Sequence, residues 1–411
     1  MTASDAIGGT AGTGNTTWDW EAEREAAVAL SLCHGLGAVG IGRLRAAHGT
    51  AHAAIGGNAE TWAAALGCSV DRAARLRQRV DLGGARREID AGRAVGAAVV
   101  AVGEPAYPTL LGAVPDPPPF LWCQGSLDAK DAWAVAVVGS RRASAYGRDQ
   151  AARFARGFAE RGHTVVSGGA RGIDAEAHRA ALRTGGRTIA VLGSGLACPY
   201  PPEHAGLFRE IADGRGAVLS EFPMSMPPRA ELFPRRNRIV SGLSLGVLVI
   251  EARARSGAAI TARIAVEDHG REAMALPGRV DSPTSEGCHR AIREGWAGLV
   301  TSVDEAIEQL GSSPQLVAGA LAVSALQPAS RELSVVAVSI GRALADGPAD
   351  RERLVDRLVS ADIDVGAAFA ELTLLELRGL ILRGSDGQYD LCESFREVLP
   401  PTRGSEETSR P

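Results

Sequence analysis

Lysine, paired cysteines and long apolar runs are scarce or missing in this 411-residue sequence. Its six cysteines are scattered without a CxxC pair, which argues against a zinc site or a disulfide framework and fits a reducing cytosol. No apolar run approaches the roughly 18 residues of a membrane-spanning helix. The first 20 residues contain neither the basic nor the apolar segment of an export signal. We therefore expect a cytoplasmic protein with no metal and no membrane contact.

Charge is distributed unevenly along the chain. The formal net charge is -4, and Lys130 is the only lysine, a bias that codon usage in an arginine-rich genome also explains. Between Arg229 and Arg263, seven arginines accompany two glutamates, a net charge of +5. From Arg331 to the end, ten basic and fifteen acidic residues give a net charge of -5. An acidic chain with a local basic field can still bind a polyanion at that field.

Changes of composition predict six segments. After residue 334, three helical patterns (335–345, 350–359 and 364–379) precede a hairpin with its turn at Asp386–Gly387, which together describe a winged helix. In chain order we expect a disordered start (1–19), a domain of short helices (20–128), an α/β domain (129–311), a linker (312–333), the winged helix (334–399) and a disordered tail (400–411).

Seven short apolar runs alternate with amphipathic stretches in the α/β segment. Continuous apolar strands separated by helices are typical of a mostly parallel sheet that helices cover on both faces, so we expect a doubly wound, extended Rossmann-like fold. The runs lie at 133–140, 163–169, 187–195, 216–223, 245–252, 271–278 and 297–302.

Glycine and polar residues follow most of these strands, at the edge where open parallel sheets bind ligands. Examples are GSRRAS at 139–144 and SGGARGID at 167–174. Tight turns need glycine anyway, but several such loops beside arginines favour a phosphate cradle. The first loop lacks the G-x-G-x-x-G of dinucleotide binding, and no Walker loop is present. We therefore expect no cofactor.

The stretch FPRRNRIVSG, Phe233 to Gly242, concentrates arginine at the start of a helix that we expect to follow Pro234. Arginine there opposes the helix dipole by a few tenths of a kcal/mol, and a bound anion would offset that cost. An aromatic ring among guanidiniums suits an unpaired base. Alternatively, the arginines are solvated or paired with Glu221 and Glu231, and Phe233 is a core residue.

Seven ordered motifs resemble the DNA-processing protein A family (DprA, also called Smf). They are VVGSRRASAYG, SGGARGIDAEAH, LGSGLACPYPPEH, SEFP, FPRRNRIVSGLS, EARARSGAAITARIA and ALPGRVDSPTSEGCHRAI. The resemblance implies a single-stranded DNA-binding protein of natural transformation, which protects incoming strands, loads a RecA-type recombinase and forms homodimers. It implies no catalytic residues.

The resemblance also implies a set of DNA-contacting positions. Asn237 is expected to brace the RRNR turn, and Asp174 either favours the dipole of its helix or braces an arginine. The expected DNA-binding residues are Gly139, Ser140, Arg141, Arg142, Ser167, Gly168, Gly169, Arg171, Gly172, Phe233, Arg235, Arg236, Asn237, Arg238, Ser256, Gly257 and Thr261.

The flanking domains resemble additions seen in the family. The segment 35–49 looks like a degenerate helix-hairpin-helix or sterile-alpha-motif-like element, although a plain helical turn explains it equally well. The third helix of the winged domain has one arginine and three acids, with Val365, Ala368, Leu372 and Leu375 as its buried stripe. A duplex-reading helix normally presents cations, so we interpret this domain as a protein-contact module.

A catalytic function is the alternative. Related Rossmann-like phosphoribohydrolases use an acid near a glycine-rich phosphate loop, and Glu221 or Glu251 could act as a general acid or base here. Such enzymes close a small pocket over one monophosphate, whereas these arginines are spread over several loops. The scattered histidines form no catalytic or metal-binding spacing and are expected to be structural.

Overall fold

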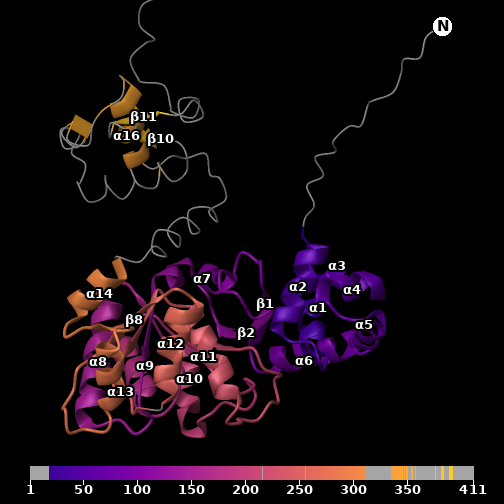
Figure 1. Cartoon of the computed structure of the whole chain (residues 1–411), viewed down its shortest axis with the longest axis horizontal. Coiled ribbons are helices and arrows are strands. Elements are labelled where there is room, and N and C mark those ends of the chain that lie inside the picture. Colours follow the sequence, from indigo (N-terminus) through magenta and orange to yellow (C-terminus); the bar gives the residue numbers. More distant parts are fainter. Residues whose placement is uncertain are drawn as a thin grey trace, which may run out of the picture. The chain divides into compact units, whose positions relative to one another are not determined.

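The computed structural model describes residues 18–214, 216–254, 256–311 and 335–345, with short stretches of the C-terminal region (347, 349, 353–354, 357, 375, 381–383 and 388–391) (Figure 1). The chain divides into two compact units. Unit 1 comprises Met1–Tyr107, Pro115–Ser126 and Leu192–Arg236, and unit 2 comprises Pro108–Val114, Leu127–Val191 and Asn237–Pro411.

Unit 1 begins with a cluster of short helices, as expected (Figure 1). Side-chain oxygens of Asp19, Thr50, Asn58, Ser69 and Asp81 cap five of them by accepting backbone N–H groups, which explains why the helices start where they do. The helices are α1 (Trp20–Leu32), α2 (Ala38–His48), α3 (Ala51–Gly56), α4 (Ala59–Leu66), α5 (Val70–Arg77) and α6 (Leu82–Ala94).

The segment expected to be helical also contains two strands, β1 (Ala97–Ala101) and β2 (Phe120–Gly125). They are antiparallel to each other, and β2 is antiparallel to β6 (Gly216–Ser220). This region is therefore not helical throughout. Its short apolar runs carry no period that separates a strand from a buried helix.

A nine-stranded sheet has the order β1-β2-β6-β5-β4-β3-β7-β8-β9. All seven strands expected from the sequence are present, and the pairs β3–β4, β4–β5, β3–β7, β7–β8 and β8–β9 are parallel. The fold is α/β with a mixed, mostly parallel sheet. The remaining strands are β3 (Ala134–Val138), β4 (Thr164–Ser167), β5 (Thr188–Val191), β7 (Gly246–Val249), β8 (Glu272–Ala275) and β9 (Gly298–Leu299).

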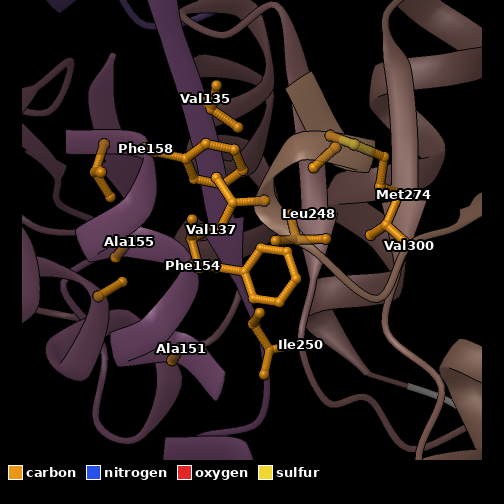
Figure 2. Close-up of a cluster of buried hydrophobic side chains, with 14 of the residues drawn as sticks. Val135, Val137, Ala151, Phe154, Ala155, Phe158, Leu248, Ile250, Met274 and Val300 are labelled. Atoms are coloured by element: carbon orange, nitrogen blue, oxygen red, sulfur yellow. The ribbon is translucent and has the colours of Figure 1, made fainter. Parts of the chain in front are cut away.

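The core of unit 2 lies between the parallel strands and the helices α8 (Ala145–Glu160), α9 (Ile173–Arg183) and α14 (Val303–Gly311). Figure 2 shows Phe154 and Phe158 of α8 packed toward Val135, Val137 and Leu248. Both rings are fully buried, and each such burial contributes about 1.5–3 kcal/mol. Because α8 and α9 follow β3 and β4 directly, this packing fixes the loops between them.

The other helices complete the two units. Helix α11 starts at Leu232, before the expected position, and Pro234 lies in its first turn, where proline breaks no hydrogen bond. These elements are α7 (Thr109–Gly112), α10 (Ala205–Ala212), α11 (Leu232–Gly242), α12 (Gly257–Arg263), α13 (Glu286–Arg293), the 3₁₀ turns η1 (Ala129–Trp133) and η2 (Pro202–His204), and the π-helical turn η3 (Ile264–Asp268).

The C-terminal region is described in part. Helix α16 (Val335–Ala345) and the antiparallel strands β10 (Ile381–Arg383) and β11 (Tyr389–Leu391) enclose a small buried cluster that includes Leu375. The expected first helix and hairpin strands are therefore confirmed. The Asp386–Gly387 turn, the linker, most of 350–379, and the stripe residues Val365, Ala368 and Leu372 lie outside the described residues, so the winged helix stays a prediction.

No helix in the described part of the chain combines the length and the apolar character needed to cross a bilayer.

Candidate nucleic-acid interface

The loops after β3 and β4 are joined at Gly172. The Ser140 carbonyl accepts the backbone N–H of Ile173 at 3.2 Å, which ties the first loop to the start of α9. Gly172 has a φ of +78° and a ψ of -123°, and a Cβ there would overlap the carbonyl oxygens of Ser140 and Arg141. Glycine is therefore required at this position both by its backbone conformation and by space.

Three arginines of these two loops are exposed: Arg141, Arg142 and Arg171. The Ser140 hydroxyl oxygen accepts the backbone N–H of Arg142 at 3.1 Å, which fixes the turn that carries both Arg141 and Arg142. Because β3 and β4 are parallel neighbours, their carboxyl ends lie at the same edge of the sheet. The loops thus present positive charge at the edge where ligands bind in open parallel sheets.

Ser167, Gly168 and Gly169 are buried, and this differs from a position that lines an open cradle. The Ser167 hydroxyl donates to the Val137 carbonyl at 2.6 Å and so joins β4 to β3. Gly169 has a φ of +66°, which allows the backbone to turn sharply. These residues shape the loop that holds Arg171.

Of the two roles expected for Asp174, its surroundings support that of a negative charge at the start of a helix. It lies in the first turn of α9, is 6% exposed, and its Oδ2 accepts the N–H of Ala170 at 3.3 Å. A carboxylate there is stabilised by the helix dipole. It also holds the loop that precedes the helix.

Glu251 is a buried brace at the end of β7. Its oxygens accept hydrogen bonds from the backbone N–H and the hydroxyl of Ser144 and from the Thr284 hydroxyl, and the residue is 2% exposed. Gly147 leaves the space that the carboxylate fills. A carboxylate with both oxygens occupied and no solvent access is poorly placed to serve as a general acid or base.

Within unit 2, the C-terminal part of α11 meets α12 through Asn237, whose Nδ2 donates to the Gly257 carbonyl at 3.3 Å. Asn237 therefore acts as a brace, with 8% exposure. The Ser256 hydroxyl caps α12, and the Thr261 hydroxyl donates back to Gly257 at 3.0 Å. Thr261 is 3% exposed, so it stabilises the helix and does not face an open surface.

The arginines of α11 divide between two faces. Arg235 is exposed and Arg238 is half-buried, whereas Arg236 is 4% exposed. In a helix, residues three apart lie on the same face, whereas consecutive side chains point in directions about 100° apart. Arg236 therefore points into the protein, which differs from the expectation that all three arginines face DNA.

The part of α11 that belongs to unit 1 lies among aromatic rings. The Arg235 guanidinium is 5.5 Å from the centroid of Phe222, and the Phe233 ring is 5.9 Å from that of Tyr200. Phe233 is half-buried, and Gly193 leaves room for its ring. The sequence analysis missed Tyr200 and Phe222, although both lie within the motifs CPYPP and SEFP.

The described residues contain no cluster of histidine, cysteine and acidic side chains able to hold a metal. Burial raises the pKa of Cys288 to about 12, so this thiol is a poor nucleophile.

The exposed Arg253, after β7, is a further cation that the sequence analysis did not single out.

Comparison with known proteins identifies the family. Residues 98–311 match the family described as DNA recombination-mediator protein A. Protein Smf of Escherichia coli is 50% identical over 204 residues, which are 50% of this chain and 54% of that protein. The chain thus spans about half the length of this relative.

The chain matches a larger share of two further relatives. The putative DNA processing protein DprA of Mycobacterium tuberculosis is 39% identical over 286 residues, 66% of this chain and 70% of that protein. The X-ray structure of DprA from Streptococcus pneumoniae superposes with a TM-score of 0.62 at 34% identity, covering 69% of this chain and 97% of that one. The chain therefore belongs to the DNA recombination-mediator protein A family.

Proposed function

We propose that this protein binds single-stranded DNA, with little sequence preference, along the carboxyl edge of its parallel strands. The observation that carries the proposal is the exposure of Arg141, Arg142 and Arg171 on two loops that the Ser140–Ile173 hydrogen bond locks together. Guanidiniums beside backbone amides bind phosphates through charge and hydrogen bonds. No base-reading pattern is needed for such contacts.

Within unit 2, Arg238 is a further cation of this surface, and within unit 1 the partly buried ring of Phe233 and the guanidinium of Arg235 are a separate proposed contact for unpaired bases. Stacking on an aromatic side chain contributes about 1–3 kcal/mol per base. The ring of Tyr200 packs against Phe233 and so helps to hold the stacking ring in place. A duplex keeps its bases stacked internally, so this contact favours single strands.

The family resemblance supports the wider role in which the protein protects strands during natural transformation in the cytoplasm. It also supports loading of a RecA-type recombinase and assembly as a homodimer. Sedimentation of the full chain tests the dimer. Filament growth on strands coated with single-strand-binding protein, with and without this protein, tests recombinase loading.

Electrophoretic titration of single- and double-stranded oligonucleotides at two ionic strengths tests DNA binding. We expect tighter binding to single strands, with a log–log salt slope that grows by about 0.7 per neutralised phosphate. Arg141→Ala and Arg238→Ala should weaken binding and flatten the slope, whereas Arg141→Lys should retain most of the slope. Arg156→Ala is the matched control, because this exposed arginine lies about 16 Å along α8 from its start.

An unchanged slope in both alanine variants would remove Arg141 and Arg238 from the interface. Equal weakening by Arg156→Ala would indicate a nonspecific charge effect instead. The nucleotide-cleaving alternative is tested by incubating the protein with purine and pyrimidine monophosphates. Because Glu251 is buried and both of its oxygens accept hydrogen bonds, we expect no released base.

A further inference from the structure

A groove of about 630 Å³ lies in unit 1, away from the loops discussed above, beside the first strand of the sheet. Strand β1 ends the strand order, so one of its sides pairs with β2 and the other is a sheet edge. Residues 97–100 of this strand line the groove together with side chains of α1 and α6.

The hydrogen bonds of β1 show which backbone groups face the groove. The N–H of Val102 donates to Pro119 at 3.0 Å, toward β2. Because directions alternate along a strand, Val100 and Ala98 also pair with β2, whereas Ala101 and Val99 turn their N–H and C=O groups outward. No other described residue hydrogen-bonds these outward groups of Val99.

Glu104 occupies the outward N–H and C=O groups of Ala101, the next outward-facing residue along the strand. It is 7% exposed, its Oε2 accepts the Ala101 N–H at 3.0 Å, and its own N–H donates to the Ala101 carbonyl at 3.1 Å. Arg24 holds this carboxylate with its Nε at 3.1 Å and with a second guanidinium nitrogen. The outward groups of Ala101 are therefore occupied, whereas Val99, which is 6% exposed, lines the groove.

The two helical walls of the groove carry opposite excess charge. Helix α6 contributes Arg86, Asp90 and Arg93, and α1 contributes Glu21, Arg24 and Glu25. The Arg86 Nε of α6 lies 2.8 Å from the Glu25 Oε1 of α1, and the Arg93 Nη1 lies 3.2 Å from the Asp90 Oδ1 within α6. Both arginine side chains are exposed, so a ligand carrying both charges can exchange partners with them at small cost.

We propose that this groove binds a short extended segment of a partner polypeptide as an added β-strand. Its backbone would pair with the Val99 N–H and C=O groups. An acidic side chain would face Arg86 and Arg93, and a basic side chain would face Glu21 and Glu25. Main-chain pairing supplies affinity and flanking side chains supply selectivity in this mode of recognition.

Labelled hexapeptides with blocked ends provide the probe. One alternates threonine and valine and carries glutamate near one end and lysine near the other, a second has the reverse order, and a third has glutamine at both positions. With the full chain, one charged peptide should bind about tenfold more tightly than the glutamine peptide. Hydrogen exchange at the Val99 amide should slow on binding.

Two variants locate the contact. Val99→Pro removes the outward N–H without touching the β1–β2 ladder, as proline is tolerated on an edge strand, and it should abolish binding. Arg93→Glu should abolish the preference for the charged peptide, whereas Arg43→Glu, an exposed arginine on α2 outside the groove, should not. Circular dichroism confirms folding, and DNA titration should be unchanged in all three variants.

The proposal is overturned if all three peptides bind alike, or if Val99→Pro binds as the parent does. It is also overturned if no peptide binds. Self-association of Glu104→Ala would then indicate that the carboxylate serves only to guard a sheet edge.

Discussion

Replacing Gly172 with alanine tests how the loops after β3 and β4, which we propose to face DNA, are joined. A φ of +78° with a ψ of -123° costs a non-glycine residue about 1–3 kcal/mol. The new Cβ would also overlap the Ser140 carbonyl oxygen and disturb its 3.2 Å hydrogen bond from Ile173, worth about 0.5–1.5 kcal/mol. We expect Gly172→Ala to lower the free energy of unfolding by about 2–4 kcal/mol.

Urea unfolding followed by tryptophan fluorescence measures this change as a lower midpoint at an unchanged slope. Gly206→Ala is the matched control, because a Cβ on Gly206 of α10 meets no atom within 4 Å and a helical glycine-to-alanine change stabilises by up to about 1 kcal/mol. Gly172→Ala should also bind single-stranded DNA more weakly, since it disturbs the Ser140–Ile173 hydrogen bond that connects the loops of Arg141 and Arg171. A Gly172→Ala protein as stable as the parent would refute the reasoning.

Three further predictions concern buried groups. Glu251→Gln should lower the free energy of unfolding by about 1–3 kcal/mol in urea titrations, because an amide cannot accept all the hydrogen bonds of the carboxylate; an unchanged midpoint would contradict the brace. Burial lowers the pKa of His163 below 6.5, so the stability due to the neutral ring is present above pH 6.5 and lost as pH falls through the lower folded pKa. Thermal unfolding between pH 7.5 and 5 should show this loss, and His163→Gln should reduce it; parallel pH profiles would argue against it. Because burial raises the pKa of Cys288 to about 12, iodoacetamide at pH 8 should alkylate this thiol only after denaturation, and rapid labelling of the native protein, read by mass spectrometry, would disprove its burial.

The sequence predicted the parallel strands well because each is a short apolar run bounded by glycine. Strands β1 and β2 were missed because AAVVA and FLWCQG also suit a buried helix, and the pairing partner β6 lies far along the chain. The early start of α11 was missed because Pro234 was placed before the helix, although the first turn accepts proline.

For the proposed site residues, the sequence indicates the place in the chain but not whether the side chain is exposed. Arg141 and Arg171 follow strands in glycine-rich loops, and they are exposed as expected. The burial of Ser167 and Arg236 depends on side chains that pack from distant segments, which local pattern does not contain. Glu251 was considered as an acid because the sequence does not show that Ser144 and Thr284 occupy its oxygens.

Photo-crosslinking of a 4-thiothymidine oligonucleotide, read by mass spectrometry, tests the central claim most directly. We predict adducts within 139–142 and 168–172 and at Phe233, with their yield reduced in Arg141→Ala. Adducts confined to the β1 groove or to the far end of α8, with none on these loops, would contradict DNA binding at the carboxyl edge of the sheet.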